Sequence, residues 1–318
     1  MSYTPGFSHI GLSSPQGQAE TRLRTTKTSQ PKLALMRIRQ IPIPLPPLAE
    51  QRRIAGVLNT IQDAIAAQED VIAAARELKR SLMQRLFTYG PYREPAETKE
   101  TEIGEIPVHW EMVEFGSQVD LLSGYAFKSE HYTDDYNAPR LLRGDNIAQG
   151  RLRWDNEKRW PLDGTEDIDR YWLRPGDVVL AMDRPWIPAG MKCAMVAESD
   201  VPSLLVQRVA RLRPKKLDTS SFVKYLLTGH RFADYVLSVQ TGTSVPHISG
   251  QQIRSFKLGL PPVSEQIQIG EELESVETKI AAEEDRLTAL QALFKSMLHQ
   301  LMTGQIRLLS DDGEFPVT

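Results

Sequence analysis

The chain has 318 residues, of which 41% are hydrophobic and 25% charged, and this is the composition of a folded globular protein rather than a disordered or membrane-embedded one. Its formal net charge of −3 creates no overall attraction for a polyanion, so a nucleic acid would have to meet a local basic patch. The N-terminus lacks the pattern of a secretory signal and the single cysteine excludes an internal disulfide, so we expect a cytoplasmic protein with no membrane partner.

The sequence contains an internal repeat. Residues 26–89 align without a gap on residues 241–304, at a constant offset of 215. The strongest match joins the Leu-Pro-Pro-Leu-Ala-Glu-Gln segment at 45–51 to the Leu-Pro-Pro-Val-Ser-Glu-Gln segment at 260–266. The two copies flank a block that is not repeated, so the repeat has to be interpreted before a fold is assigned.

Each copy predicts one long helix after its Pro-Pro pair. Apolar residues recur at alternating steps of four and three, from Ile54 to Leu86 and again from Ile269 to Leu301, which is typical of a coiled-coil seam. Proline fits the first turn of a helix, and the glycines at 90 and 304 fit its end. We expect the two helices to pair with each other as an antiparallel coiled coil, or with a second molecule.

Two polar residues interrupt the seams at equivalent positions, Gln68 in the first copy and Glu283 in the second. A polar residue in a seam can fix the register of the pair at some cost in stability. The alternative is a solvated gap where the helices separate. The sequence leaves both interpretations open.

The unrepeated block predicts a domain with both helices and strands. Residues 91–104 are polar and contain prolines, which is typical of a linker. Short apolar runs separated by turn residues come next. The expected elements are strands within 171–181, 192–197 and 204–212 and helices over 220–228 and up to about residue 237. The fold class is therefore α+β: one mixed α/β domain flanked by two long helices.

Polar and basic side chains of this block are of the kinds that proteins use on nucleic acids. Arg and Asn read base edges, whereas Lys, hydroxyl groups and backbone amides hold phosphates. The run from Arg208 to Lys216 is favoured, because its basic residues have no acidic residue among them. For any single residue, ordinary surface charge is the alternative. The candidates for nucleic-acid contact are Lys128, Arg143, Asn146, Arg151, Arg153, Arg184, Trp186, Lys192, Arg208, Arg211, Arg213, Lys215, Thr241, Thr243 and Ser244.

The sequence shows no motif for catalysis. The six histidines and one cysteine have no metal-ligand spacing. A phosphate-binding loop, a methyltransferase motif and a serine-nucleophile motif are all absent from the sequence. We therefore expect no catalytic residue, no metal and no cofactor.

Taken together, these features resemble the specificity subunit of type I restriction–modification systems, in a truncated half-subunit form with one target recognition domain. The resemblance covers residues 26 to about 307. It is carried by residues 41–51 and 258–266 with the helices after them, by Gly-Glu-Ile-Pro-Val-His-Trp at 104–110, which is similar to the usual opening of a recognition domain, and by residues 242–248, which are similar to its usual close.

The resemblance implies a non-catalytic subunit that reads double-stranded DNA. A complete subunit of this kind holds two recognition domains, each reading half of a split site, while paired helices set their spacing and dock two methyltransferase subunits that restriction subunits join. The implied layout is a tail of a missing first recognition domain at 1–40, a conserved helix at 41–90, a linker at 91–104, the recognition domain at 105–259, a second conserved helix at 260–304 and a C-terminal tail at 305–318. Residues 1–25 would correspond to residues 220–240.

A single recognition domain leaves three hypotheses. The chain can be a half-subunit that pairs with a copy of itself and reads an inverted repeat, because two-fold protein symmetry is mirrored in the DNA site. It can be a truncated relic that docks methyltransferase subunits without specifying a site. It can also be an enzyme with an unrecognised site, in which case the chain alone would cleave DNA with a divalent metal.

Overall fold

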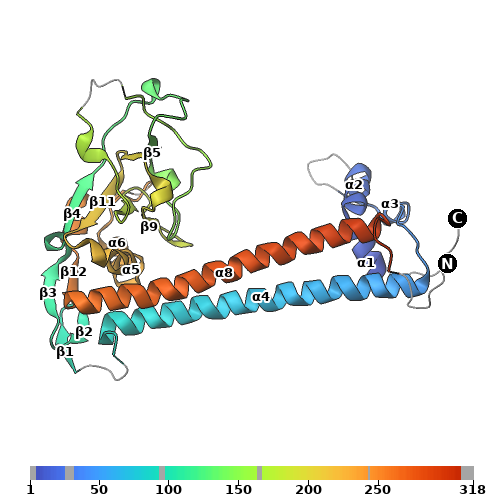
Figure 1. Ribbon diagram of the computed structural model, residues 1–318, viewed down its shortest axis with the longest axis horizontal. Coiled ribbons are helices and arrows are strands. Elements are labelled where there is room, and N and C mark those ends of the chain that lie inside the picture. Colours follow the sequence, from blue (N-terminus) through green and yellow to red (C-terminus); the bar gives the residue numbers. More distant parts are fainter. Residues whose placement is uncertain (1–4, 26–31, 93–96, 163–166, 243, 309–318) are drawn as a thin grey trace. The chain divides into compact units, whose positions relative to one another are not determined.

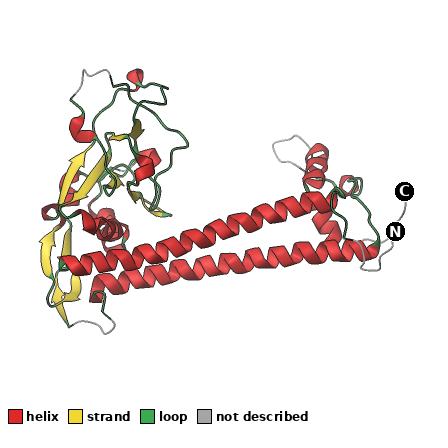
Figure 2. Ribbon diagram, viewed as in Figure 1, coloured by secondary structure: helices red, strands yellow, loops and turns green. Residues whose placement is uncertain are grey.

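The computed structural model describes residues 5–25, 32–92, 97–162, 167–242 and 244–308. The fold divides into two compact units, Met1–Arg76 with Lys279–Thr318 and Glu77–Thr278, which we call the first and second unit. The division crosses both long helices, so each unit contains a stretch of each. Figure 1 labels the elements and Figure 2 shows their types.

The described α-helices are α1 (Pro5–Ser13), α2 (Pro15–Arg24), α3 (Leu35–Ile38), α4 (Leu48–Tyr89), α5 (Ser220–Thr228), α6 (His230–Val239), α7 (Gly250–Arg254) and α8 (Val263–Met302). The described strands are β1 (Thr98–Thr101), β2 (Gly104–Pro107), β3 (Glu111–Glu114), β4 (Val119–Ser123), β5 (Arg140–Leu142), β6 (Val178–Ala181), β7 (Trp186–Ile187), β8 (Gly190–Met191), β9 (Cys193–Met195), β10 (Ser203–Leu205), β11 (Val209–Pro214) and β12 (Lys257–Leu260).

The long helices α4 and α8 lie side by side and antiparallel, within one chain (Figure 1). Every predicted seam position on both helices is buried or half-buried, while most positions between them are exposed. In the first unit, Ile54 and Leu58 of α4 share one apolar cluster with Leu298 and Leu301 of α8. The predicted pairing of the two helices is therefore confirmed, and its driving force is the burial of an apolar stripe from each.

The polar pair in the seam makes a specific contact. The side chain of Gln68 is 5% exposed, and its Nε2 donates to Oε2 of Glu283 at 2.6 Å and to the Glu283 carbonyl at 3.2 Å. Because these residues are equivalents in the repeat, they meet as two copies of one helix do when they pair about a local two-fold axis. A buried amide with a defined partner favours the register-fixing interpretation over a solvated gap.

The structural repeat begins earlier than the sequence repeat. Helix α1 starts at Pro5 and α5 at Ser220, and 220 − 5 gives the same offset of 215 that separates α2 from α6. Phe7 and Phe222 hold equivalent positions, and each is 1% exposed. The helices that we expected to correspond thus do so in secondary structure, although their sequences show little likeness.

The second unit contains a four-stranded antiparallel sheet with the order β4-β11-β6-β9. Helix α5 packs against β6, β9 and β11. One face of the sheet belongs to a cluster with Leu180 and Leu212, and the other face belongs to a cluster with Val179 and Val209. Burial on both faces explains why β6 is a continuous apolar run rather than an alternating one. The predicted fold class, a mixed α+β domain between two long helices, is confirmed.

Two elements differ in detail from the expectation. The apolar run 204–212 forms two strands, β10 and β11, because the chain turns between them at Arg208, where φ is 66°. The segment 91–104, expected to be a linker, contains β1, which pairs antiparallel with β2. None of the described helices combines the length and the apolar character that a bilayer crossing requires.

A buried carboxylate at the start of α8 anchors the opening of the domain. Oε1 of Glu265 accepts a hydrogen bond from the Tyr92 hydroxyl at 2.7 Å and lies 2.8 Å from Nε2 of His109. Its Oε2 accepts from the indole of Trp110 at 2.9 Å. Glu265 is 7% exposed, so these partners replace the water that the carboxylate loses. Strand β3, which comes after Trp110, then pairs with β12 directly before α8.

The first unit repeats this arrangement with different chemistry. Glu50, the equivalent of Glu265, accepts from Nε and Nη2 of Arg307 at 2.7 and 2.9 Å, and Arg307 is the equivalent of Tyr92 because 307 − 92 is 215. The neighbouring glutamine has the same role in both copies. Nε2 of Gln51 donates to the Pro46 carbonyl at 3.0 Å, as Gln266 donates to the carbonyl of Pro261 at 2.8 Å. The repeated Pro-Pro-x-x-Glu-Gln segment is thus a helix start with an anchoring carboxylate.

Replacement of Ile280 by Asp tests the helix pair. Ile280 is 7% exposed, and a carboxylate there would be buried without a partner, so we expect the free energy of unfolding to fall by about 3 kcal/mol or more. The neighbouring Ala281 is exposed, and Ala281→Asp should cost less than about 1 kcal/mol. Denaturant unfolding followed by circular dichroism measures both, and equal losses would contradict the seam.

Replacement of Glu265 by Ala tests the anchor of the domain. Removing the carboxylate leaves the buried indole N–H of Trp110 without its acceptor, and we expect a loss of about 1–3 kcal/mol in the free energy of unfolding. Glu271→Ala, at an exposed position of the same helix, is the matched control. If both variants unfold at the same denaturant concentration as the unmodified chain, Glu265 does not anchor the domain.

Candidate nucleic-acid interface

Three loops of the second unit are tied together by backbone hydrogen bonds. The amide of Met182 donates to the Arg208 carbonyl at 2.8 Å, and the amide of Arg184 donates to the Pro246 carbonyl at 2.7 Å. The amide of Ile248 donates to the Met182 carbonyl at 2.9 Å. Loops that are far apart in sequence, around residues 182–192, 206–208 and 244–248, are thereby fixed into one surface.

Basic side chains gather on this surface. Burial lowers the pKa of Lys192. The Asp145 carboxylate acts to raise this pKa, whereas the nearby guanidinium groups of Arg153 and Arg184 lower it further. A fourth cation, Arg208, joins them through Asp183, whose Oδ1 lies 3.7 Å from its Nη1. We call Arg153, Arg184, Lys192 and Arg208 the basic cluster. All four were predicted from sequence, and the structure brings them together.

Asp183 also contacts a histidine that the sequence analysis did not select. Nδ1 of His247 lies 2.6 Å from Oδ1 of Asp183, the oxygen that also faces Arg208. His247 comes directly after the Thr-Gly-Thr-Ser-Val-Pro segment at 241–246, whereas the matching segment at 26–31, Thr-Lys-Thr-Ser-Gln-Pro, is followed by Lys32. This difference between the copies is a signal in the sequence that could have pointed to it.

Three further candidates lie on the same loops. Trp186 in β7 is 38% exposed, which is high for a tryptophan. Thr241 and Ser244 are exposed, and Thr241 exchanges backbone hydrogen bonds of 2.9 and 2.8 Å with His247. Thr243 lies outside the described residues. Two hydroxyl groups and an indole therefore lie on the three joined loops, two of which carry Arg184, Lys192 and Arg208.

Two of the favoured arginines are buried in ion pairs instead. Arg211 is 5% exposed, and its guanidinium contacts the Asp120 carboxylate and donates to the Arg170 carbonyl at 3.2 Å. Nε and Nη2 of Arg213 donate to the fully buried Asp177 at 2.6 and 2.8 Å, and this contact raises the pKa of Arg213. Both residues lie on β11 inside the sheet, so their charges are neutralised within the fold and little of either is free for DNA.

Asn146 shapes the turn that carries a cluster residue. It is 2% exposed; its Oδ1 accepts from the Arg143 amide and its Nδ2 donates to the Arg153 carbonyl, both at 3.1 Å. Nη2 of Arg143 donates to the Asn156 carbonyl at 2.8 Å. These hydrogen bonds satisfy the side-chain amide of Asn146 within the chain. Asn146 therefore has a structural role, which is to hold the turn that carries Arg153.

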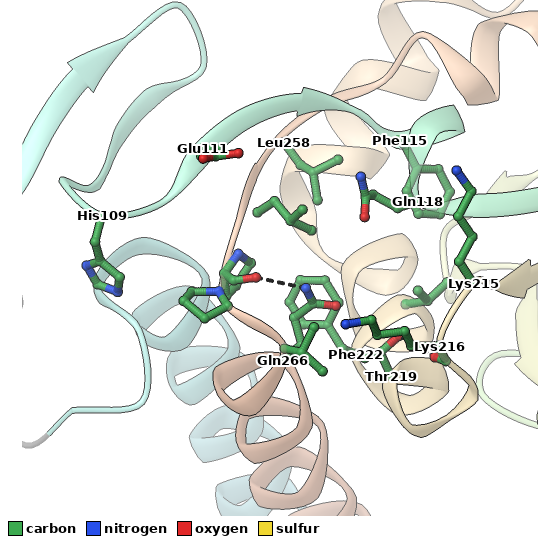
Figure 3. Close-up of a pocket in the computed structure, with 15 residues that line it drawn as sticks. His109, Glu111, Phe115, Gln118, Lys215, Lys216, Thr219, Phe222, Leu258 and Gln266 are labelled. Carbon is green, nitrogen blue, oxygen red and sulfur yellow. Dashed lines mark hydrogen bonds between the residues drawn. The ribbon is translucent and has the colours of Figure 1, made fainter.

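The remaining candidates are not joined to the basic cluster by any contact described. Lys128 and Arg151 are exposed. Lys215 lines a cavity of about 410 Å³ with Lys216 and the rings of Phe115 and Phe222, at the start of α8 (Figure 3). Within the described part of the chain, no three His, Cys, Asp or Glu side chains form a group that could hold a metal ion.

Comparison with known proteins gives one family. A model described as the type I restriction modification DNA specificity domain matches residues 18–75 and 107–292. The MjaVIII specificity subunit of Methanocaldococcus jannaschii is 32% identical over 287 residues, which are 90% of this chain and 67% of that protein. The EcoAI specificity subunit of Escherichia coli is 40% identical over 168 residues, 52% of this chain and 28% of that one.

A solved structure shows the same fold. It comes from work on the assembly and conformational transition of a type I restriction–modification system, is 17% identical, and superimposes with a TM-score of 0.60 over 96% of this chain and 72% of the other. The chain spans less than the full length of each of these relatives.

The chain therefore belongs to the family of type I restriction–modification specificity subunits. Members of this family supply the DNA specificity of a multi-subunit complex and are not themselves catalytic. The expected family is thus confirmed.

The double replacement Arg153→Ala with Lys192→Ala tests the basic cluster. If both groups meet phosphates, DNA affinity should fall and the slope of log affinity against log salt should become shallower by about 0.9 for each phosphate that is no longer neutralised. Lys257→Ala, which removes an exposed lysine paired with Glu102, is the control. The measurement is fluorescence anisotropy of labelled duplex with the chain in complex with its methyltransferase subunits. An unchanged slope would exclude both residues from the interface.

Proposed function

We propose that this chain reads one half of a split site in double-stranded DNA, using the loops that carry the basic cluster. The observation that supports this is the gathering of three cations, an exposed indole and two hydroxyl groups on loops fixed to one another by backbone bonds, with a fourth cation, Arg153, on a neighbouring turn. Such a mixture suits DNA, because phosphate contacts supply affinity while Arg and polar groups read base edges.

The chain is proposed to carry no chemistry and to dock methyltransferase subunits, two per complex, on the paired helices α4 and α8. A charged, exposed outer surface on a helix pair whose apolar stripe is already buried suits this role, because the helices do not need a partner to be stable. Restriction subunits would join the same complex. The complex would then be located with the DNA, in the cytoplasm.

The partner of the recognition domain is proposed to be a second copy of the chain. The described residues contain one recognition domain, and a split site needs two, so two copies related by a two-fold axis would read inverted half-sites. The helices pair within the chain, so this association would not use their seam. The alternative, a scaffold that docks methyltransferase subunits without specifying a site, differs in its effect on the DNA.

Single-molecule methylation sequencing tests the function. The chain is expressed with its methyltransferase subunit in cells that lack other modification systems, and the methylated motif is read from their DNA. We expect a split, palindromic motif. An asymmetric motif would mean that a different recognition chain is the partner. Absence of a motif, with the methyltransferase active beside another specificity subunit, would support the scaffold and contradict DNA reading.

A further inference from the structure

Two arginines of the interface hold an unfavourable backbone conformation. Arg184 has φ of 46° and Arg208 has φ of 66°, and among the described non-glycine residues these two have positive φ. A side chain crowds the backbone in this left-handed region, whereas glycine adopts it without a steric penalty. The presence of a large residue at such a strained position points to a role for its side chain.

The backbone contacts of these residues do not require arginine. The Arg184 amide donates to the Pro246 carbonyl and the Arg208 carbonyl accepts from the Met182 amide, and glycine has the same two groups. Both side chains extend away from the core. Arg184 is exposed, and the side chain of Arg208 is 61% exposed. Neither guanidinium therefore has a packing role that would explain why an arginine occupies this position.

Asp183 stands between them. It directly precedes Arg184 in the chain, and its Oδ1 faces both Nη1 of Arg208 at 3.7 Å and Nδ1 of His247 at 2.6 Å. The histidine contact fixes the carboxylate, and the carboxylate in turn limits the directions that the Arg208 guanidinium can take. Asp183 is 37% exposed at its side chain, so the pair lies at the surface and is open to a ligand.

We propose that Arg184 and Arg208 are the specificity-determining residues of this chain, each contacting the edge of a guanine, and that Asp183 is the positioning residue that holds Arg208. The planar guanidinium fork of arginine matches the O6 and N7 acceptors of guanine in the major groove. Arg153 and Lys192, beside them, contact phosphates. The proposal rests on the proposed function, because it needs DNA as the ligand.

Glycine variants separate the side chain from the fold. Arg184→Gly and Arg208→Gly remove the guanidinium and relieve the backbone, so we expect thermal stability to be unchanged or higher. The methylated motif of each variant should become degenerate at one guanine position of the half-site, with discrimination at that position reduced roughly 10- to 100-fold. Lys257→Ala, outside the basic cluster, is the control and should leave the motif unchanged.

The same experiment can overturn the proposal. An unchanged motif, with weaker binding to all sequences and a shallower salt dependence, would make both arginines phosphate contacts. A loss of stability in the glycine variants would make them structural. If the unmodified chain itself gives no motif, the proposed function fails, and that result is distinct from a motif that the variants do not change.

Asp183→Asn tests the positioning role. Asparagine keeps an oxygen that can accept from His247 but loses the charge that faces Arg208. We expect the motif to relax at the same guanine as in Arg208→Gly and to stay intact at the guanine assigned to Arg184. The double variant Asp183→Asn with Arg208→Gly should relax the motif no further than Arg208→Gly alone. A motif identical to that of the unmodified chain, or relaxation at other positions, would remove Asp183 from the recognition of DNA.

Discussion

The second unit depends on one buried carboxylate. Glu265 lies in the first turn of α8, where the helix dipole favours a negative charge. It contacts Tyr92, which follows the end of α4, and His109 and Trp110 at the opening of the domain. Since Trp110 directly precedes β3 and β3 pairs with β12, the anchor fixes both the entry and the exit of the chain. The sheet and its loops are built between these two fixed points.

Charge is divided between the interior of the domain and its surface. Arg211 and Arg213 are neutralised by Asp120 and Asp177 within the sheet, where a charge without a partner would be costly. The cations of the basic cluster lie outside the strands of the four-stranded sheet, and Arg153, Arg184 and Arg208 are exposed. A nearly neutral chain can thus present a local positive surface, which is the distribution that its net charge of −3 required of any DNA contact.

Periodic features of the fold were predictable from the sequence, whereas contacts between distant residues were not. Seam positions were identified because the helix repeat imposes them. The ion pairs of Arg211 and Arg213 could not be predicted from the run between Arg208 and Lys216, because their partners are 91 and 36 residues away. Asp183 and His247 were not selected for the same reason, since 64 residues separate them. The correspondence of α1 with α5 was weak in sequence because helix position is retained while most side chains differ.

The contact between Gln68 and Glu283 has a consequence for how the length of this subunit can change. A contact between a residue and its own copy marks the centre of a duplicated pair. Because the two helices are antiparallel, the segment after Gln68 in α4 faces the segment before Glu283 in α8. A heptad inserted in one helix alone displaces all partners beyond it and leaves apolar residues unmatched. A heptad gained after Gln68 therefore has to be matched by one gained before Glu283, at the same end of the pair, if the seam is to keep its register.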